Sequence, residues 1–404
     1  MGVVSPIGIG TDVFWNALTT GKSGAARVTL FDVTGYTCQI AAEIKGFEPE
    51  NYIEKKTIRR MDRFTQFAYA AADMAIRDAQ LDQAKTDPDR VGVIVGTGIG
   101  GLSTIEEEHI VLREKGARRV SPFLIPKLIS NMAPGEIAIR WGYTGPNYAV
   151  SSACATSNHA IGDAMRLLRY GDADVMIAGG SEAAITPLGF AGFCSARTLT
   201  TRNDAPEKAS RPFDLNRDGF LMGEGAGIVV LETLDHAVAR GAKIYAELAG
   251  YGATDDAYHI TAPNPEATSS VKAMQRALVD ADLKPEDIQY VNAHGTSTEL
   301  NDKTETKALK LVFGEHAKKL AISSTKSMTG HLLGAAGVTE LIATTLNITH
   351  QIAHPTINYE TPDPDCDLDY VPNKPRPMLI TNAISNSLGF GGHNAVLAVK
   401  RYAA

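Results

Sequence analysis

The segment Ala149–Asn158 constrains the fold most, because it sets one cysteine, Cys154, between a short apolar run and a strongly amphipathic helix pattern. Apolar residues recur at helical spacing after the cysteine, at Ile161, Ala164, Met165 and Leu168. Gly171 is suited to end that helix. The pattern therefore places Cys154 at or just before a helix N-terminus. Free backbone amides and the positive end of the helix dipole favour a thiolate there, which is the form that a nucleophile needs.

A cysteine considered alone is more often a small buried core residue than a nucleophile. Two histidines change the interpretation here. His294 stands in the segment Asn292–Thr298 and His331 in Lys326–Leu332, and both segments contain glycine and are typical of strand ends. Either histidine alone would more often be a hydrogen-bonded core residue, but a cysteine with two such histidines indicates a catalytic site.

Length, cysteine usage and charge limit the class of protein. A chain of 404 residues exceeds the usual size of a single hydrophobic core, so we expect two packed halves. No apolar run reaches the roughly 18 residues of a membrane span, and the first residues lack the layout of a signal peptide. Cys38, Cys194 and Cys366 are scattered without CxxC spacing, which predicts reduced thiols in the cytoplasm and no metal site. A net charge of −7 argues against general nucleic-acid binding but leaves room for a local basic patch.

Basic residues gather in two places that could bind an acidic partner. The segment from Lys55 to Arg77 has helical spacing, with basic residues on one face and apolar residues on the other, which predicts one continuous helix. A second basic group lies near residue 118. The members of this basic patch are Lys55, Lys56, Arg59, Arg60, Arg118 and Arg119. A charge run is also typical of an ordinary solvated surface, and the sequence leaves both interpretations open.

Two motifs suggest other functions and fail on inspection. Gly96–Gly101 follows the apolar run Val91–Val95 and fits the G-x-G-x-x-G pattern of dinucleotide-binding folds. Such a fold needs an acidic strand end about 20 residues later, where this chain has the basic, proline-broken segment Gly116–Phe123. Asp214–Gly219 resembles the start of a calcium loop, but Gly225 stands where the loop needs a glutamate. We expect a close backbone approach at the first motif and a rigid turn at the second.

The order of predicted elements indicates an internal duplication. Apolar strands alternate with helical patterns, and the closing run Gly389–Lys400 repeats the layout of Gly223–Glu232, glycines first and then apolar residues. This alternation predicts an α/β fold with two parallel-rich sheets and helices between and outside them. We place the first half at residues 1–241, with the cysteine, and the second at 242–404, with both histidines.

These motifs resemble the β-ketoacyl-acyl-carrier-protein synthases of the thiolase superfamily, and within them the synthase II group of bacterial type II fatty-acid systems. The resemblance covers nearly the whole chain and rests on Ser151–Ser157, Ser210–Phe220, Gly223–Gly227, Asn292–Thr298, Ser324–His331 and Asn386–His393. It implies a thiolase-like fold, a duplicated five-layered α-β-α-β-α arrangement. One departure is at the start: the family has a buried strand before Val-Ser-Pro, and this sequence begins at Met1, so we expect that strand to be cut short or lacking.

The resemblance also implies a reaction, a decarboxylative Claisen condensation in fatty-acid chain elongation. Cys154 would take an acyl chain from a carrier-protein thioester, with the backbone amides of Cys154 and Phe390 as the oxyanion hole. Malonyl-carrier protein would then lose carbon dioxide, and His294 and His331 would stabilise the enolate to give a 3-oxoacyl product. The partner would be an acidic acyl carrier protein, which brings its own phosphopantetheine arm, so no resident cofactor is expected.

The remaining roles follow from the same resemblance. Lys326 would take part in the site, with Glu340 balancing its charge. Thr296 and Thr298 would bind the amides of the phosphopantetheine arm, although both are also ordinary turn residues. Ile99, surrounded by glycines, would be enclosed at the end of the acyl tunnel near a homodimer interface, and Phe390 would act as a gate beside the cysteine.

Three other functions remain to be weighed against the condensation. A ketosynthase of a type II polyketide pathway shares these motifs. A non-catalytic chain-length-factor subunit shares the fold but lacks the cysteine, so Cys154 argues against it. A degradative thiolase pairs cysteines with one histidine, and this chain has two histidines in the family motifs.

Overall fold

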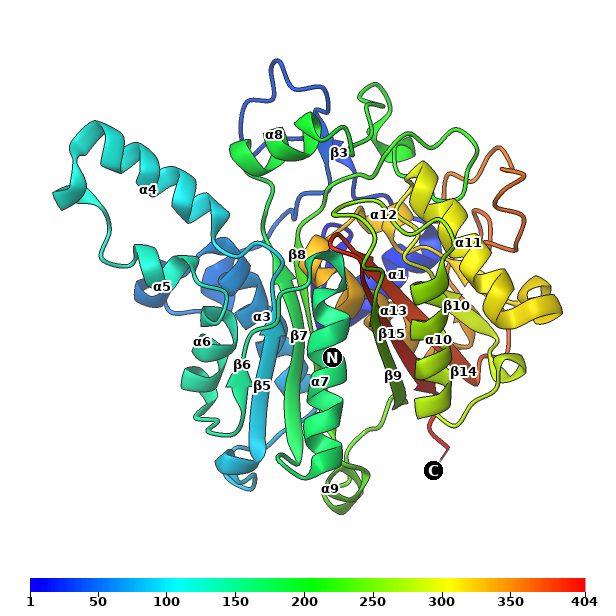
Figure 1. Ribbon diagram of the computed structural model, residues 1–404. Helices are drawn as coiled ribbons and strands as arrows, with labels where there is room; N and C mark the ends of the chain where they lie inside the picture. The colour runs from blue at the N-terminus through cyan, green and yellow to red at the C-terminus, as the bar shows by residue number, and fades with distance from the viewer. Residues whose placement is uncertain (404) are drawn as a thin grey trace.

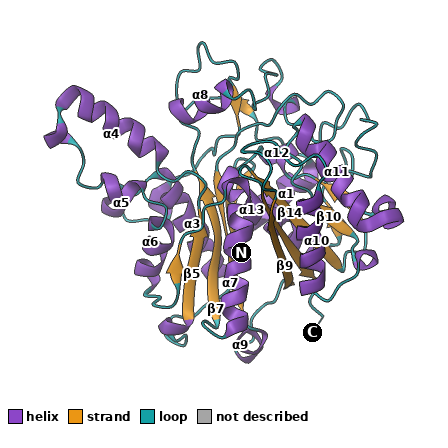
Figure 2. Ribbon diagram, viewed as in Figure 1, coloured by secondary structure: helices purple, strands orange, loops and turns teal. Residues whose placement is uncertain are grey.

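Two β-sheets with a pair of helices between them form the framework of the molecule, in a computed structural model that describes residues 1–403 (Figures 1 and 2). The first sheet is drawn from residues up to Glu232, and the second from Glu247 onward. No helix of residues 1–403 is long and apolar enough to cross a membrane.

The elements of the first sheet and its surroundings are β1 (Gly2–Ser5), β2 (Gly8–Ile9), α1 (Thr11–Thr20), β3 (Ala26–Arg27), β4 (Ile40–Ala41), α2 (Lys55–Ile58), α3 (Arg63–Asp78), β5 (Val91–Gly96), α4 (Leu102–Lys115), α5 (Leu124–Leu128), α6 (Met132–Trp141), β6 (Asn147–Tyr148), α7 (Thr156–Tyr170), β7 (Val175–Glu182), α8 (Pro187–Ser195), β8 (Gly225–Glu232) and α9 (Leu234–Ala239). Those of the second are β9 (Glu247–Asp255), α10 (Thr268–Asp280), β10 (Tyr290–Asn292), α11 (Glu299–Phe313), β11 (Ala321–Ser323), α12 (Lys326–Thr329), α13 (Ala336–His350), β12 (Ile352–Ala353), β13 (Arg376–Pro377), β14 (Asn382–Gly389) and β15 (His393–Lys400).

The two sheets repeat one topology. The strand order β1-β8-β7-β5-β6 of the first sheet matches β9-β15-β14-β10-β11 of the second, and β2 extends only the first. Corresponding neighbours also run in the same relative direction. The prediction of parallel-rich sheets is wrong, because in each sheet two of these four pairings are antiparallel. The turn Phe390–Gly392 joins β14 directly to β15, and so short a link permits only antiparallel pairing.

Five layers result from the packing of helices on these sheets. Helices α7 and α13 contact each other and lie between the sheets, so that Ile161 and Met165 share one apolar core with Leu341 and Ile342 (Figure 1). Helices α3 and α6 cover the outer face of the first sheet, and α10 packs on the outer face of the second with α11 beside it. This confirms the predicted α-β-α-β-α arrangement and thiolase-like fold.

Helix α7 shows why the sequence around the cysteine folds as predicted. Its residues Ile161, Ala164 and Met165 are buried, as their spacing requires. Gly171 ends the helix in the left-handed conformation, φ 80°, and its N–H bonds back to the carbonyl oxygens of the last turn. The helix therefore begins at Thr156, directly after the short 3-10 turn Ala153–Ala155 that holds Cys154.

The predicted continuous helix from Lys55 to Arg77 is in fact two helices. α2 ends at Ile58, and α3 begins at Arg63 after buried Met61 and Asp62. Asp62 is the N-cap of α3, where its carboxylate accepts from the backbone N–H of Phe64. The Asp62 carboxylate also accepts from Ser103 and Thr104 at the start of α4. A capping carboxylate fixed by a second helix therefore interrupts the pattern.

The first strand is present but short. β1 pairs Gly2–Val4 with Ala226–Ile228 of β8, so of the two outcomes expected from the sequence, a lacking strand is excluded. Its counterpart β9 pairs along the full length of β15, with one bulge. The second sheet is thus more completely paired at this position than the first.

Candidate active site

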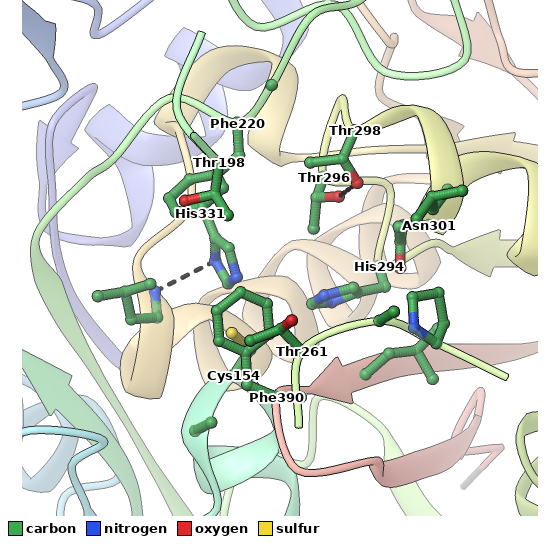
Figure 3. A pocket seen from close by; sticks show the side chains of 18 of the residues that line it. Cys154, Thr198, Phe220, Thr261, His294, Thr296, Thr298, Asn301, His331 and Phe390 are labelled. Atoms are coloured by element: carbon green, nitrogen blue, oxygen red, sulfur yellow. Dashed lines mark hydrogen bonds between the residues drawn. The ribbon is translucent and has the colours of Figure 1, made fainter. Parts of the chain in front are cut away.

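A cavity of about 540 Å³ lies at the carboxyl ends of the central strands of both sheets, where parallel strands in α/β folds commonly hold their ligands. Both halves of the chain line it. Of the residues predicted from sequence, the cavity brings together Cys154, His294, His331, Phe390, Thr296 and Thr298 (Figure 3). Ile99 lines the same cavity.

Cys154 lies in a strained turn that the end of β14 touches. Ala153, the first residue of the turn, has a left-handed φ of 50°, which costs a residue with a side chain of its own. A Cβ atom on Gly389 would lie 2.8 Å from the Ser152 carbonyl oxygen, so only glycine fits there. This close approach brings the backbone N–H of Phe390 near the Cys154 thiol, where it acts to lower the pKa of the thiol. Two backbone amides, those of Cys154 and Phe390, therefore border the nucleophile.

The structure corrects the expectation that Cys154 rests as a thiolate. Burial is the main cause, and it raises the pKa of the Cys154 thiol to about 12. Lys326 and the Phe390 amide act in the opposite direction, whereas Glu182 and Glu340 raise the pKa further. The low dielectric of the closed site thus outweighs the helix start, because burial penalises the charged form. At neutral pH the thiol carries its proton until substrate arrives.

The two histidines present the same kind of donor to the cavity. Nδ1 of His331 accepts from the backbone N–H of Leu333 at 3.2 Å, and Nδ1 of His294 lies 3.3 Å from the Lys326 ammonium, which can only donate. Each ring therefore carries its proton on Nε2. Burial, followed by the charge of Lys326, holds both pKa values well below their usual range, so both rings are neutral.

The two histidine rings are arranged so that both Nε2–H groups face the same cavity. The ring centroids are 5.4 Å apart, with the planes at 84°, and Phe220 packs edge-on against His331 (Figure 3). Nε2 of His331 is buried without a hydrogen-bond partner in the described residues. A buried polar atom left unpaired is costly, which suits a donor that awaits a substrate oxygen.

Lys326 lies beneath His294 and is paired with Glu340. Its ammonium is buried, forms an ion pair with the Glu340 carboxylate and donates to the His294 carbonyl oxygen at 2.7 Å. Burial raises the pKa of Glu340 to about 7, although Lys326 opposes this shift. The pair contacts the histidine's backbone and ring nitrogen and does not line the cavity. Its geometry is that of a support for His294.

Sequence reasoning missed two buried carboxylates at the site, Glu305 and Glu182. Glu305 accepts from the backbone N–H groups of His294 and Gly295, each at 2.8 Å. The sequence pattern could have identified Glu305, because it lies on the same face of α11 as the buried residues Ala308 and Leu309. A charged residue on a buried helix face is unusual. Glu182 ends a strand and gives no such signal.

The remaining predicted residues differ in their surroundings. Thr296 and Thr298 line the cavity, and their hydroxyl oxygens are 2.9 Å apart. Ile99 also lines the cavity and is 40% exposed in the single chain, and its enclosure by a partner subunit stays a prediction. Its loop is a wall of the cavity with an outer side that this chain leaves uncovered.

All six members of the basic patch are exposed, and none lines the cavity. The guanidinium of Arg60 stacks on the ring of Phe123, 5.0 Å from its centroid. Phe123 follows closely after Arg118 and Arg119 in the chain, so the structure brings the α2 group toward the second basic group.

The fold and the site together define an acyltransferase of thiolase-like fold. The model of the "Beta-ketoacyl synthase, N-terminal domain" matches residues 1–237, and that of the "Beta-ketoacyl synthase, C-terminal domain" matches residues 245–360. The chain belongs to the β-ketoacyl synthase family.

Curated relatives resemble the chain over its full length. It is 52% identical over 402 residues to 3-oxoacyl-[acyl-carrier-protein] synthase 2 of Synechocystis sp., and 54% identical over 404 residues to the protein of that name from Staphylococcus aureus. Each alignment covers 100% of this chain and 97% of the relative.

Solved structures agree with the fold. A type II polyketide ketosynthase in complex with its acyl-carrier protein has a TM-score of 0.93 at 38% identity, and the ishigamide ketosynthase/chain length factor has 0.94 at 37%. Both cover 100% of this chain and 98% of the matched chain.

Proposed function

We propose that the chain catalyses decarboxylative condensation of an acyl chain held on Cys154 with malonyl-acyl-carrier protein, in fatty-acid elongation. One observation carries the proposal: a buried thiol, two backbone amides and two Nε2–H donors face one cavity. The naming of full-length relatives at 52% and 54% identity as 3-oxoacyl-[acyl-carrier-protein] synthase 2 supports it.

The first half-reaction is acyl transfer. The Cys154 sulfur attacks the thioester carbon of the acyl-carrier, and the oxyanion of the tetrahedral intermediate accepts hydrogen bonds from the amides of Cys154 and Phe390. Each such donor contributes about 3–4 kcal/mol to transition-state stabilisation in known enzymes. The carbon–sulfur bond to the carrier breaks, and the proton of Cys154 leaves with the carrier thiol. The raised pKa of Cys154 requires this proton transfer to accompany attack.

The second half-reaction joins the chains. Malonyl-carrier loses carbon dioxide, and the electron pair of the broken bond forms an enolate whose oxygen accepts from Nε2–H of His294 and His331. The enolate carbon attacks the acyl group on Cys154, and collapse of the intermediate gives 3-oxoacyl-carrier and returns the thiolate, which takes up a proton. Each step uses only protein groups and the two thioesters, so the proposal requires no cofactor.

The partner in this proposal is an acidic acyl carrier protein that docks on the basic patch. A chain of net charge −7 repels an acidic protein unless basic residues gather near the entrance. Reversing the charges of Lys56 and Arg60 together should slow carrier association about tenfold and weaken its salt dependence. The same reversal of exposed Lys319 and Lys374, in the second half, is the control with equal net charge. Equal effects of the two double variants would refute the docking site.

A homodimer is the second proposed assembly. The edge strand β6 is exposed, and α4 and α5 extend away from the body of the chain (Figure 1). This arm carries exposed apolar residues, Ile105, Ile110, Leu112, Phe123, Ile125 and Ile129. An exposed apolar arm beside an open sheet edge is typical of a surface that a second copy covers. Sedimentation should show a dimer that Ile125→Asp weakens and Leu379→Asp, at a 64% exposed site, leaves intact.

The decisive experiment combines defined acyl-carriers with malonyl-carrier and reads the products by mass. We expect one condensation per cycle and a 3-oxoacyl-carrier two carbons longer. Repeated condensation without reduction of the keto group would favour a polyketide ketosynthase, whose structures resemble this chain at 37–38% identity. Absence of any condensation by folded protein would contradict both and favour a chain-length-factor role, against which Cys154 stands.

A further inference from the structure

Glu182 joins three segments of the site through one buried carboxylate. The side chain ends β7, is fully buried and lines the cavity. Its Oε1 accepts from the Thr97 hydroxyl at 2.8 Å and from the Ile99 N–H at 3.2 Å. Its Oε2 accepts from the Gly98 N–H at 2.8 Å and the Gly334 N–H at 3.0 Å. Loops from both halves of the chain therefore meet on this one group.

Within the described residues, the groups that favour the charged form of Glu182 are hydrogen-bond donors and include no cation. Its four hydrogen bonds oppose the effect of burial, which raises the pKa of Glu182. Its charge also raises the pKa of Cys154 and would oppose a negative intermediate nearby. The negative charge of Glu182 thus disfavours both the Cys154 thiolate and a negative intermediate. We therefore expect Glu182 to have a function that offsets this unfavourable effect.

The loops that Glu182 holds touch the two substrates in the proposed reaction. Ile99 forms part of the cavity wall beside Cys154. On the other side, Gly334 directly follows Leu333, whose N–H fixes Nδ1 of His331. Glu182 is thus one hydrogen bond from the Ile99 wall, and it accepts from the amide that directly follows the one orienting His331.

The loop at Gly98 and the turn at Gly334 pack closely against each other and against Glu182. A Cβ atom on Gly98 or on Gly334 would lie 2.7 Å from Oε2 of Glu182, and one on Gly334 would lie 2.4 Å from the Gly98 nitrogen. Closely packed groups transmit displacement, because neither loop can move without compressing or stretching the bonds to the other. A chain that displaces the loop at Ile99 therefore moves the turn that carries Leu333.

We propose that Glu182 is a positioning residue that couples occupancy of the acyl cavity to the orientation of His331. The inference rests on the proposed function and adds a regulation of its second half-reaction. An acyl chain that contacts Ile99 displaces its loop, and the hydrogen bonds of Glu182 transmit this displacement to the turn at Leu333. The Nε2–H of His331 is then oriented toward the enolate oxygen. Malonyl-carrier is then decarboxylated faster on acylated enzyme than on free enzyme, which limits wasteful loss of carbon dioxide.

The test measures carbon dioxide release from malonyl-carrier by free enzyme and by enzyme acylated on Cys154 with a C16 chain. The informative quantity is the ratio of the two rates, because a defect in folding lowers both rates alike. Glu182→Gln keeps the size of the side chain but turns one acceptor into a donor that faces backbone N–H groups. The ratio should fall at least about fivefold toward one, as expected for loss of buried hydrogen bonds.

Glu43→Gln is the matched control. Glu43 is also a buried carboxylate that accepts from a threonine hydroxyl and two backbone N–H groups, those of Thr29 and Leu30, but it does not line the cavity. Its ratio should equal that of the natural protein. If Glu182→Gln fails to fold, Thr97→Val removes one of the four bonds and should lower the ratio by a smaller factor.

The outcomes separate this inference from the proposed function. An unchanged ratio in folded Glu182→Gln or Thr97→Val overturns the coupling, as does a ratio of one in the natural protein that condenses normally. A natural protein that neither takes an acyl chain on Cys154 nor releases carbon dioxide contradicts the proposed function itself.

Discussion

The two halves of the molecule build matching turns and put different chemistry in them. The turn before α7 has Cys154 at its centre, and the corresponding turn before α13 has Gly334. Both open with a residue in the left-handed region, Ala153 at φ 50° and Leu333 at φ 49°. The duplicated backbone thus supplies a strained helix start twice, and only one copy carries a nucleophile.

The loops after the matched strands β5 and β10 show the same division. A buried carboxylate holds each loop by two consecutive backbone N–H groups: Glu182 holds Gly98 and Ile99, and Glu305 holds His294 and Gly295. The first loop forms a wall of the cavity, and the second presents a donor. The fold therefore sets positions in pairs, whereas single residues decide which member of each pair reacts.

The difference between the two halves depends most on the nucleophile in the first half. Cys154→Ser should lower condensation by at least about 10⁴-fold, because a buried hydroxyl is a much weaker nucleophile than a thiol. Mass spectrometry of the acylated protein and of the product measures this. Cys194→Ser, at a half-buried thiol outside the cavity, should stay near natural activity. Retained acylation in Cys154→Ser would move the nucleophile elsewhere.

A pH series distinguishes the effect of the helix start from that of burial. Since the pKa of Cys154 is raised to about 12, the thiolate fraction grows about tenfold per pH unit below that value. Alkylation by iodoacetamide, followed at Cys154 by peptide mass, should therefore rise by about 10³-fold from pH 7 to pH 10. A plateau below pH 8 would show that the helix start dominates.

The second half is tested through its histidines. His294→Ala or His331→Ala should lower malonyl decarboxylation by about 10²–10³-fold, the usual cost of one lost donor to an oxyanion. Acylation of Cys154 should fall less, because backbone amides serve that step. Exposed His109→Ala is the control. A variant that acylates slowly yet decarboxylates at the natural rate would reverse this assignment.

The ion pair of Lys326 with Glu340 gives the stability of the second half a pH dependence below neutral pH. Burial raises the pKa of Glu340 from its ordinary value of 4.5 to about 7. Between these values the folded protein keeps a proton that the unfolded chain has lost, so this group makes the free energy of unfolding fall as pH rises. Glu340→Gln lacks that fall.

Denaturant unfolding at pH 5 and pH 7 measures the difference. The stability of Glu340→Gln relative to the natural protein should increase by about 1–3 kcal/mol between the two pH values. A constant difference would mean that Lys326 keeps the carboxylate charged throughout this range.

A change of similar size is expected at the turn without a nucleophile. A Cβ on Gly334 would lie 2.4 Å from the Gly98 nitrogen, so Gly334→Ala should lower the free energy of unfolding by about 1–3 kcal/mol. Gly135→Ala, in α6 with open space around it, should be neutral or stabilising. Equal stabilities of the two variants would show that the close contact at Gly334 does not affect the free energy of unfolding.

The sequence predicted elements whose side chains are apolar at a regular period. β5, β7, β8 and β15 are apolar runs, and α7 has a clear amphipathic pattern. β14 was missed because its buried residues include Ser385, Asn386 and Ser387, and β9 because Gly250 and Gly252 interrupt it. Those glycines allow α10 to lie close, since a Cβ there would meet its backbone.

The reacting residues could be found by motif, but their state could not. Cys154, His294 and His331 stand in long specific segments, whereas the raised pKa of Cys154 arises from burial by both halves. Glu182 contacts Gly334, which lies 152 residues further along the chain, and no local pattern encodes such a contact. Tertiary burial and long-range hydrogen bonds therefore account for what the sequence did not show.

The shared central layer also bears on how the chain is made. The face of α7 that meets α13 is apolar, and its partner surface on α13 lies some 180 residues further along the chain, as Ser157 and Val338 illustrate. During synthesis the first sheet can assemble with α7 packed on it once β8 has emerged, but the face of α7 that meets α13 stays uncovered until α13 follows. Exposed apolar surface on such a nascent chain promotes aggregation. The layer that unites the active site thus makes the newly made first half dependent on rapid completion of the second, or on a chaperone that covers α7 in the interval.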